Sequence, residues 1–437
     1  MNSLTTKPFQ LLWAALVLTL CSGRAAAQPD PDEPYGKIVK EIRLPELKWT
    51  KEHVILRELV SKVGEVYTKE NAELDLERLD RLDLFASFDI RAIPSGDQVI
   101  LELECEEEYP RIIFPAITST DENGISVGAG FRTINLLGLG VTTGANARFG
   151  GQTSVGADFE DPWVRGLGNH FGLRVAGGWV KRQNEVHNFE EESFRFAVRP
   201  SMWIGDSGRV GTRLIYQSLK SDDPEITLSP DGRDSLPSLA AYIGLDTRDV
   251  LSDPTTGWHN ELEVSKAFGD ADYWTFTVDL RRYLPVKERH TVFASSLTTL
   301  RTGQLGVEIP TYQVFTFGGI NSVRGWEFNQ RRGKNQFLNT VEYRYDWVPM
   351  RVLNLFGGIR FRAGVEVVGF GDFGVLWEEG NQFALNNFIG GYGGGLRLLM
   401  AGIGAIRLDF GWGQSGAKVF VGFGVFPKAD MQRARVR

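Results

Sequence analysis

The sequence predicts a mainly β protein: a sixteen-stranded antiparallel transmembrane β-barrel preceded by one small α+β domain of order β-α-α-β-β. The chain of 437 residues is rich in glycine, with 50, and in aromatic residues, at 11%. From residue 111 onward, segments of about ten residues alternate apolar and polar side chains. Beyond the N-terminus, no apolar run reaches the roughly 18 residues of a membrane-spanning helix. Because only helices and closed barrels satisfy every backbone group in a bilayer, the alternation favours a barrel.

Residues 1–27 have the features of a secretory signal peptide. Lys7 supplies a weak basic region, residues 9–21 are apolar, and Ala25-Ala26-Ala27 provides a cleavage site of small residues. We expect cleavage after this site, which leaves residues 28–35 as a short linker that contains prolines. The exported chain is then either periplasmic or a membrane β-barrel.

Composition and motifs argue against several classes of function. A net charge of −7 offers no basic surface for nucleic acid. The five histidines are scattered, with no HExxH or paired-cysteine spacing, so no metal site is predicted. No GxSxG element or phosphate-binding glycine loop occurs, so we predict neither enzyme activity nor a cofactor. After signal cleavage Cys105 is the single cysteine, which excludes an intramolecular disulfide.

Residues 36–108 predict the small α+β domain. A strand at 38–44 is followed by a helix over 50–63, which Thr50 caps. A second helix spans about residues 69–84, with leucines at helical spacing, and two strands follow. The last strand alternates most clearly, and its apolar side consists of Val99, Leu101, Leu103 and Cys105.

This order of elements resembles a POTRA domain. The phrase Leu84-Phe85-Ala86-Ser87-Phe88 before the second strand and the acidic end of the third strand add to the resemblance. A generic α+β module is the alternative. The resemblance implies a periplasmic domain that handles unfolded polypeptide, because the free edge of a three-stranded sheet can bind an extended peptide as an added strand. Only one such domain fits before residue 110.

Residues 110–427 carry the alternating segments of the predicted barrel. One example pairs an apolar face with a polar face: Trp274, Phe276, Val278 and Leu280 against Thr275, Thr277, Asp279 and Arg281. A soluble sandwich also alternates, but here the apolar faces are uniform over many strands and aromatic at their ends, as in a lipid-facing band. We count about 16 such segments, an even number that allows antiparallel closure. A basic tail follows at 428–437, and we expect it to stay in the periplasm.

The first and last barrel segments predict a weak lateral seam. The last segment, at 418–426, has Gly422 and Gly424 on its inner face, which leaves that face bare. The first segment, at 111–120, contains Pro115, which cannot donate to a hydrogen-bond ladder. If these two segments close the barrel, their seam is short of hydrogen bonds. The alternative is that Pro115 only marks a frayed start of the first strand.

The loop at 318–330 contains the motif Val323-Arg324-Gly325-Trp326. A lone Arg-Gly pair normally belongs to a surface loop. This motif, however, closely resembles the V/I-R-G-F/Y signature in the sixth outer loop of the BamA/TamA/FhaC superfamily of assembly and secretion barrels. Trp326 is a mild departure from the usual Phe or Tyr. Other phrases resemble the family in order and spacing, at 135–140, 161–163, 245–249, 371–374, 394–397 and 406–411.

The resemblance also implies a partner for the loop arginine. In the family this arginine reaches into the lumen and pairs with an acid on a neighbouring strand, and Asp372 occupies the matching position here. The alternation supports this assignment, because it turns Glu366 and Asp372 inward. Asp409 and Glu342 face inward by the same parity and are second candidates, although for these two we favour simple solvation in the lumen.

Three functions remain open. The first is an assembly factor that folds and inserts β-barrel proteins into the bacterial outer membrane through the POTRA-like domain and the lateral seam. The second is a secretion pore for one unfolded partner, as in two-partner systems, but such pores usually carry two POTRA domains and a plug helix. The third, a passive porin, needs neither the loop motif nor the small domain. Expected partners are unfolded outer-membrane or secreted polypeptides, the lipid bilayer and accessory assembly proteins.

Overall fold

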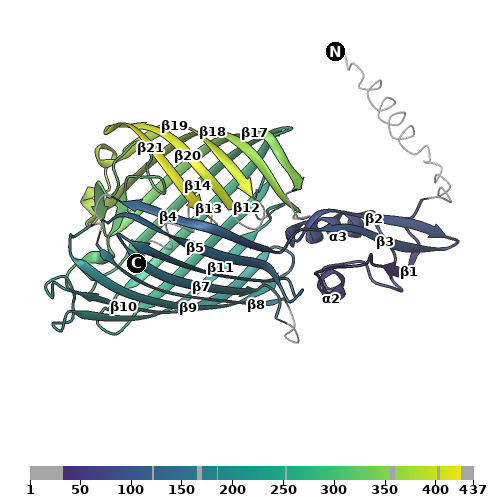
Figure 1. The fold of residues 1–437 in the computed structure, drawn as a ribbon, viewed down its shortest axis with the longest axis horizontal. Helices are drawn as coiled ribbons and strands as arrows, with labels where there is room; N and C mark the ends of the chain where they lie inside the picture. Colours follow the sequence, from purple (N-terminus) through teal and green to yellow (C-terminus); the bar gives the residue numbers. More distant parts are fainter. Residues whose placement is uncertain are drawn as a thin grey trace, which may run out of the picture.

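The computed structural model describes most of the chain. The described residues are 33–120, 123–164, 170–184, 186–250, 253–354, 360–400 and 404–424. The predicted signal peptide and the predicted basic tail lie outside these ranges. Figure 1 shows a large barrel-like sheet with a small domain at one end.

The small domain has the predicted order of elements. They are β1 (Ile38–Arg43), α2 (Glu52–Leu56), α3 (Lys69–Arg81), β2 (Phe85–Ser95) and β3 (Gln98–Glu107). β3 lies in the middle of the sheet, parallel to β1 and antiparallel to β2. Residues 64–67 cover part of the β1 edge, because they exchange backbone hydrogen bonds with residues 36–39. Among the described residues, β2 has no further strand beside it in this sheet.

The first helix is shorter than predicted, because α2 ends at Leu56 rather than at Val63. The carboxylate of Asp75 on α3 accepts hydrogen bonds from the backbone amides of residues 60–61. Those amides are therefore not available to continue a helical ladder. Thr50 does not cap the helix either, since its hydroxyl accepts a hydrogen bond from a barrel residue instead.

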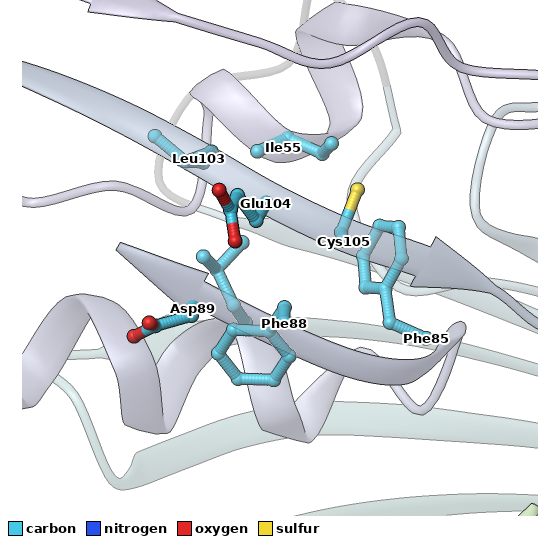
Figure 2. A pocket seen from close by; sticks show the side chains of 8 residues that line it. Ile55, Phe85, Phe88, Asp89, Leu103, Glu104 and Cys105 are labelled. Atoms are coloured by element: carbon cyan, nitrogen blue, oxygen red, sulfur yellow. The ribbon is translucent and has the colours of Figure 1, made fainter. Parts of the chain in front are cut away.

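Cys105 is partly buried and packs against the core of the small domain. Figure 2 shows its side chain beside Ile55 and Phe85 in a small pocket between α2 and the sheet. Burial raises the pKa of the thiol to about 11. The thiol is therefore protonated near neutral pH and is a poor nucleophile.

The barrel is one sheet of 16 strands, in which each strand pairs antiparallel with the next barrel strand of the chain. The strands are β4 (Arg111–Thr120), β5 (Gly124–Leu136), β6 (Val141–Gly150), β7 (Thr153–Asp161), β8 (Phe171–Gln183), β9 (Glu190–Ile204), β10 (Gly208–Ser221), β11 (Arg233–Asp246), β12 (Gly257–Ala267), β13 (Trp274–Lys287), β14 (His290–Arg301), β17 (Asn335–Asn354), β18 (Arg360–Trp377), β19 (Ile389–Met400), β20 (Gly404–Gly413) and β21 (Gly416–Gly424). Between β14 and β17 the chain forms the short helix η1 (Thr311–Gln313) and a separate ladder of β15 (Phe315–Phe317) with β16 (Arg331–Gly333). The predicted fold class is confirmed.

The outward face of the sheet is apolar. Along β17, Val341 and Tyr343 are half-exposed, whereas Thr340 and Glu342 are buried, as strand alternation requires. Exposed apolar side chains recur on most other strands, among them Ile113, Phe131, Val155, Phe196, Leu214, Ile243, Leu262, Phe276, Leu300, Phe373, Leu398, Phe410 and Val421. A soluble protein rarely exposes so much continuous apolar surface, whereas a lipid-facing band requires it. In the part of the chain that the structure describes, no helix has both the length and the apolar character needed to cross a membrane.

β4 and β21 are the two edges of this sheet. Over the residues that the structure describes, no ladder joins these two strands. Pro115 is not a frayed strand start, because β4 begins at residue 111 and continues through Pro115, which lies opposite Ala129 of β5. On β21, Gly422 and Gly424 lie opposite residues 407 and 405 of β20. The described sheet therefore ends in two edge strands that no ladder joins.

Candidate functional site

The loop of residues 302–334, between β14 and β17, folds back into the barrel. Val323 and Trp326 are almost fully buried and pack with Leu338 of β17 and Ile389 of β19. Leu338 has the inward parity of its strand, so this apolar cluster lies on the inner side of the wall. The cluster holds the residues on both sides of Arg324 in fixed positions.

Arg324 is fully buried and contacts Asp372 of β18 through three donors. Its Nε lies 2.7 Å from Oδ2 and its Nη2 lies 3.0 Å from Oδ1, which makes a bidentate pair. The backbone N–H of Arg324 also donates to Oδ2 at 3.1 Å, and the hydroxyl of Thr340 donates to Oδ1 at 2.8 Å. Bidentate charged hydrogen bonds are among the strongest in proteins, so Asp372 fixes the orientation of the guanidinium.

Asp409 of β20 and Glu342 of β17 contact the same arginine, rather than being solvated in the lumen as we expected. Nη1 lies 3.1 Å from Asp409 Oδ2, and Nη2 lies 3.1 Å from Glu342 Oε1. The guanidinium carbon lies 3.3 Å from the ring centroid of Phe370. We call Arg324 with its three carboxylates the loop cluster. The expectation failed because parity tells which side of the wall a residue faces, but not its height along the barrel.

Two arginines of the barrel wall extend the loop cluster. Arg397 of β19 lies 2.7 Å from Glu342 and 3.3 Å from Glu366, and Arg344 lies 2.9 Å from Glu342. Buried charges are costly unless they are paired and hydrogen-bonded. The wall therefore supplies cations for part of its own acidic surface, and Arg324 of the loop supplies the cation for the rest.

Glycines of β19 and β20 make room for the loop backbone. A Cβ on Gly391 would lie 1.7 Å from the carbonyl oxygen of Arg324, and one on Gly411 would lie 2.7 Å from the amide nitrogen of Gly325. Gly325 itself has a φ of +92°, a left-handed conformation that favours glycine. Sequence analysis missed this role of the wall glycines. The signal that could have revealed it is the repetition of glycine at alternate, inward positions of these two strands.

Trp326 has a contact that depends on its indole. Its Nε1 donates to the carbonyl oxygen of Gly390 at 2.9 Å. A Phe at this position has no donor at all, and a buried indole N–H requires an acceptor. Where the family motif usually has Phe or Tyr, this chain has Trp326, and the carbonyl oxygen of Gly390 on β19 accepts the hydrogen bond of its indole.

The tip of the loop lies over the inner face of β21. A Cβ on Gly422 would lie 2.6 Å from Cδ1 of Ile320. Next to it, Arg407 of β20 donates from Nη2 to Oδ1 of Asn321 at 2.9 Å. The inner face that we expected to be bare is thus occupied by the loop. The loop consequently contacts β21, one of the two edge strands of the sheet.

A family model for the Omp85 superfamily domain matches residues 135–423, which is more than half of the chain. This chain belongs to the Omp85 superfamily. The matched range includes the loop motif and every residue of the loop cluster, and the predicted resemblance is confirmed. Members of the Omp85 family are outer-membrane barrels for assembly and transport, and they are not enzymes.

Individual relatives of this Omp85 barrel are distant. The chain is 22% identical over 358 residues to the outer membrane protein assembly factor BamA of Nitratidesulfovibrio vulgaris, an alignment that covers 76% of this chain and 43% of that protein. It therefore spans less than half the length of this curated relative. Among solved structures, BamA from Haemophilus ducreyi lacking POTRA domains 1–3 has a TM-score of 0.54 at 14% identity, covering 89% of this chain and 83% of that one. CdiB from Escherichia coli has a TM-score of 0.58 at 13% identity, covering 89% and 75%. At these identities the likeness shows a shared fold.

The POTRA-like domain contacts the rim at one end of the Omp85 barrel (Figure 1). Arg362, near the start of β18, lies 2.6 Å from Asp83 of the domain and also contacts the carboxylate of Glu108, just before β4. Burial raises the pKa of Glu108, although Arg362 opposes this shift. We call Arg362 with these two acids the rim contact. Because a buried carboxylate without its arginine is unfavourable, Arg362 favours the docked position of the domain.

Helix α3 of the domain reaches two other turns of the rim. Arg78 pairs with Asp206, in the turn between β9 and β10. The Nε of Arg81 donates to the carbonyl oxygen of Arg248, in the turn between β11 and β12, at 3.1 Å. The domain therefore spans several turns of the barrel mouth rather than resting on one.

A cavity of about 530 Å³ extends from the domain into the lumen. Arg78 and Arg81 line it on the domain side, and Glu342, Arg344 and Arg397 line it deeper in the barrel. The inserted loop borders the same acidic and basic wall from the other end. The lumen is thus occupied by the loop at one end and covered by the domain at the other.

Proposed function

We propose that this chain is an outer-membrane protein assembly factor that assists the folding and insertion of β-barrel proteins. In this proposal the POTRA-like domain handles unfolded polypeptide in the periplasm, and the lateral seam receives the strands of the client. The observation that carries the proposal is the seam, where β4 and β21 have no ladder between them among the described residues. Unpaired strand edges recruit further strands through their backbone donors and acceptors.

The occupied lumen supports a lateral route over passage through the barrel. A polypeptide that crosses the lumen has to displace Arg324 from three carboxylates and also has to move the domain away from Arg362. A strand that adds at β4 or β21 from the side requires neither change. The lateral route is therefore the less costly one for a client that is itself a β-sheet protein.

The edge of β2 supports the assigned role of the small domain. β2 spans 11 residues and, within the described chain, pairs with no strand other than β3. An extended segment of an unfolded client can pair with such an edge through main-chain hydrogen bonds. Because these bonds do not depend on side chains, the edge suits many different clients.

A polypeptide-secretion pore is the second candidate. The cavity of about 530 Å³ favours it, because this space already leads from the domain toward the inserted loop. The loop would then act as the gate of the pore. The two functions differ in which proteins are lost when the chain is missing.

The deciding experiment is depletion of the protein, followed by quantitation of the outer-membrane and secreted proteomes. We expect many outer-membrane barrels to fall together. Loss of a single secreted protein, with the barrels unchanged, would overturn the assembly proposal in favour of the secretion pore.

The lateral route has its own test, in a Cys105→Ser background. A bismaleimide cross-link between Ile113→Cys on β4 and Val421→Cys on β21 should block insertion of a client barrel into liposomes. The matched control is a cross-link between Phe410→Cys and Val419→Cys, which lie opposite each other on the paired strands β20 and β21. Equal activity of the seam-linked and control proteins would rule out the seam as the route.

A further inference from the structure

The loop of residues 378–388, between β18 and β19, lies against the outside of the barrel wall. β18 starts near the small domain, so this loop is at the opposite, outer end of the barrel. Phe337 and Trp377 have the outward parity of β17 and β18, whereas the adjacent Leu338 and Leu376 belong to the apolar cluster inside. The loop contacts the outward pair. It therefore folds in the opposite direction from the loop that carries Arg324.

Aromatic packing holds this loop on the wall. The ring centroid of Phe383 lies 4.8 Å from that of Trp377 and 6.2 Å from that of Phe337. Phe388 lies 6.1 Å from Phe337 and 5.7 Å from Phe383, again edge to face. As a result Trp377 is only 9% exposed, although Phe373 on the same face of β18 is 46% exposed.

Hydrogen bonds within the loop give it a defined shape. It contains two 3₁₀ turns, η3 (Gly380–Gln382) and η4 (Leu385–Asn387). The side-chain oxygen of Gln382 accepts from the backbone amide of Glu378 at 2.7 Å, and Asn387 donates to the carbonyl oxygen of Gln382 at 2.7 Å. The side chains at its tip are therefore presented in fixed directions.

The loop exposes two large apolar side chains, beside the uncharged polar side chains of Gln382, Asn386 and Asn387. Leu385 is 89% exposed and Phe383 is 48% exposed, next to the apolar outer face of β17 and β18. The segment 378–388 contains no Lys, Arg or His, and its acids, Glu378 and Glu379, stand at its start, beside the strand. Two exposed apolar side chains beside the lipid-facing band, in a segment without a cation, match the boundary between acyl chains and head groups at a membrane interface.

We propose that this loop is a membrane-interface anchor, in which Leu385 and Phe383 insert at the boundary between the acyl chains and the head groups of the outer leaflet. The partner is lipid, and the recognition is apolar rather than electrostatic. β18 also carries Asp372, so the anchor holds the wall strand that binds the loop arginine. The anchor does not depend on the proposed function, because an assembly factor and a secretion pore both need a fixed position in the bilayer.

The test uses an environment-sensitive fluorophore on Leu385→Cys, in a Cys105→Ser background. The protein is reconstituted in phosphatidylcholine–phosphatidylglycerol liposomes that contain lipids with nitroxide-labelled acyl chains. We expect blue-shifted emission and nitroxide quenching close to that of the lipid-facing control Val421→Cys. Folding of each labelled variant is checked by its heat-modifiable migration in gels.

The matched control is Val307→Cys, which is 60% exposed but belongs to the inward-folding loop. This position should show water-like emission and at least twofold less quenching than position 385. If Leu385→Cys is quenched no more than Val307→Cys, the anchor is wrong. Blue-shifted emission without nitroxide quenching would also overturn it, since the side chain would then be covered by protein.

Discussion

The two ends of the lumen are closed by contacts of different kinds. In the loop cluster, Arg324 and its three carboxylates have side chains that are at most 2% exposed. In the rim contact, Arg362 and Asp83 are 14% and 15% exposed, whereas Glu108 is only 2% exposed. The neighbouring pair of Arg78 and Asp206 is more open, at 22% and 59%. The loop cluster is therefore dry throughout, whereas the contacts at the rim are dry at Glu108 and reached by water and salt at their other members.

This difference in burial predicts a difference in how easily each end opens. Removing one member of a buried ion network leaves charges with no compensation, which costs several kcal/mol. Pairs that water reaches are weaker and are screened by salt. The outer end should therefore stay closed unless a client or partner offers new contacts, whereas the periplasmic end should open and close with solution conditions.

Arg324→Met should have the largest effect. Asp372 and Asp409 would lose their arginine in a buried site, at a cost of about 3–5 kcal/mol. We expect the loop to leave the wall, which limited proteolysis within residues 302–334 would detect as faster cleavage. Chemical unfolding of the detergent-solubilised protein would report the lost stability.

A triple variant separates the charge from the shape of the side chain. Arg324→Met combined with Asp372→Asn and Asp409→Asn removes the uncompensated carboxylates and should recover part of the lost stability. If the triple variant is cleaved as fast as Arg324→Met alone, the buried charge is not what holds the loop.

The sequence predicts the barrel and the loop motif well, but the loop cluster only in part. Alternation is a local pattern, so it identifies strands and turns Asp372 and Asp409 inward without any knowledge of the fold. Asp409 and Glu342 reach the same arginine because the stagger between neighbouring strands brings them to the same height in the barrel. This stagger cannot be predicted from the alternation within one strand. For the same reason the wall glycines, such as Gly391, resembled ordinary turn and lumen residues.

Arg362→Ala should have an intermediate effect. It removes two charged hydrogen bonds between the barrel and the small domain, worth about 1–3 kcal/mol together. We expect a broader and longer distribution of distances between labels on Val63→Cys in the domain and Glu288→Cys in a periplasmic turn. High salt should move the wild-type distribution in the same direction.

The matched control for the domain is Arg91→Ala. Arg91 pairs with Glu104 on the surface of the small domain, with side chains 61% and 48% exposed, and neither residue belongs to the rim contact. This variant should leave the distance distribution unchanged. A shift as large as that of Arg362→Ala would mean that any loss of charge from the domain releases it.

The rim contact and the short helix α2 mark the limit of what the sequence reveals. Arg362 and Asp83 are 279 residues apart in the chain, and neither belongs to a motif. The helix predicted over 50–63 ends early because Asp75, from another helix, binds the amides of residues 60–61. Tertiary contacts of this kind override local helix propensity, which is only a weak preference.

Asp253 should give the smallest effect, a pH dependence confined to the periplasmic side. It lies between β11 and β12 and lines the cavity. Burial, together with the nearby carboxylates of Glu366 and Asp346, raises the pKa of Asp253 to about 7 from an ordinary value of 3.8. Between pH 3.8 and about 7 the folded protein keeps a proton on Asp253 that the unfolded chain has lost. Protonation of Asp253 therefore stabilises the folded state fully below the ordinary pKa, and this stabilisation is lost as the pH rises through about 7.

We therefore expect the wild-type free energy of unfolding to fall by about 1 kcal/mol between about pH 6 and about pH 8, and Asp253→Asn to remove this component. Arg344 lowers the pKa of Asp253, whereas the carboxylate of Asp249 raises it and is the weakest of these influences. Asp249→Asn should therefore lower the pKa of Asp253 a little and reduce the pH dependence of stability only slightly. The pH series uses the same unfolding assay as the Arg324→Met variant. The free energies that the two ends of the lumen contribute to stability can therefore be compared directly. If the pH dependence of stability is unchanged in Asp253→Asn, other titrating groups cause it. The periplasmic end would then differ from the loop cluster in its exposure to water, but not in its response to pH.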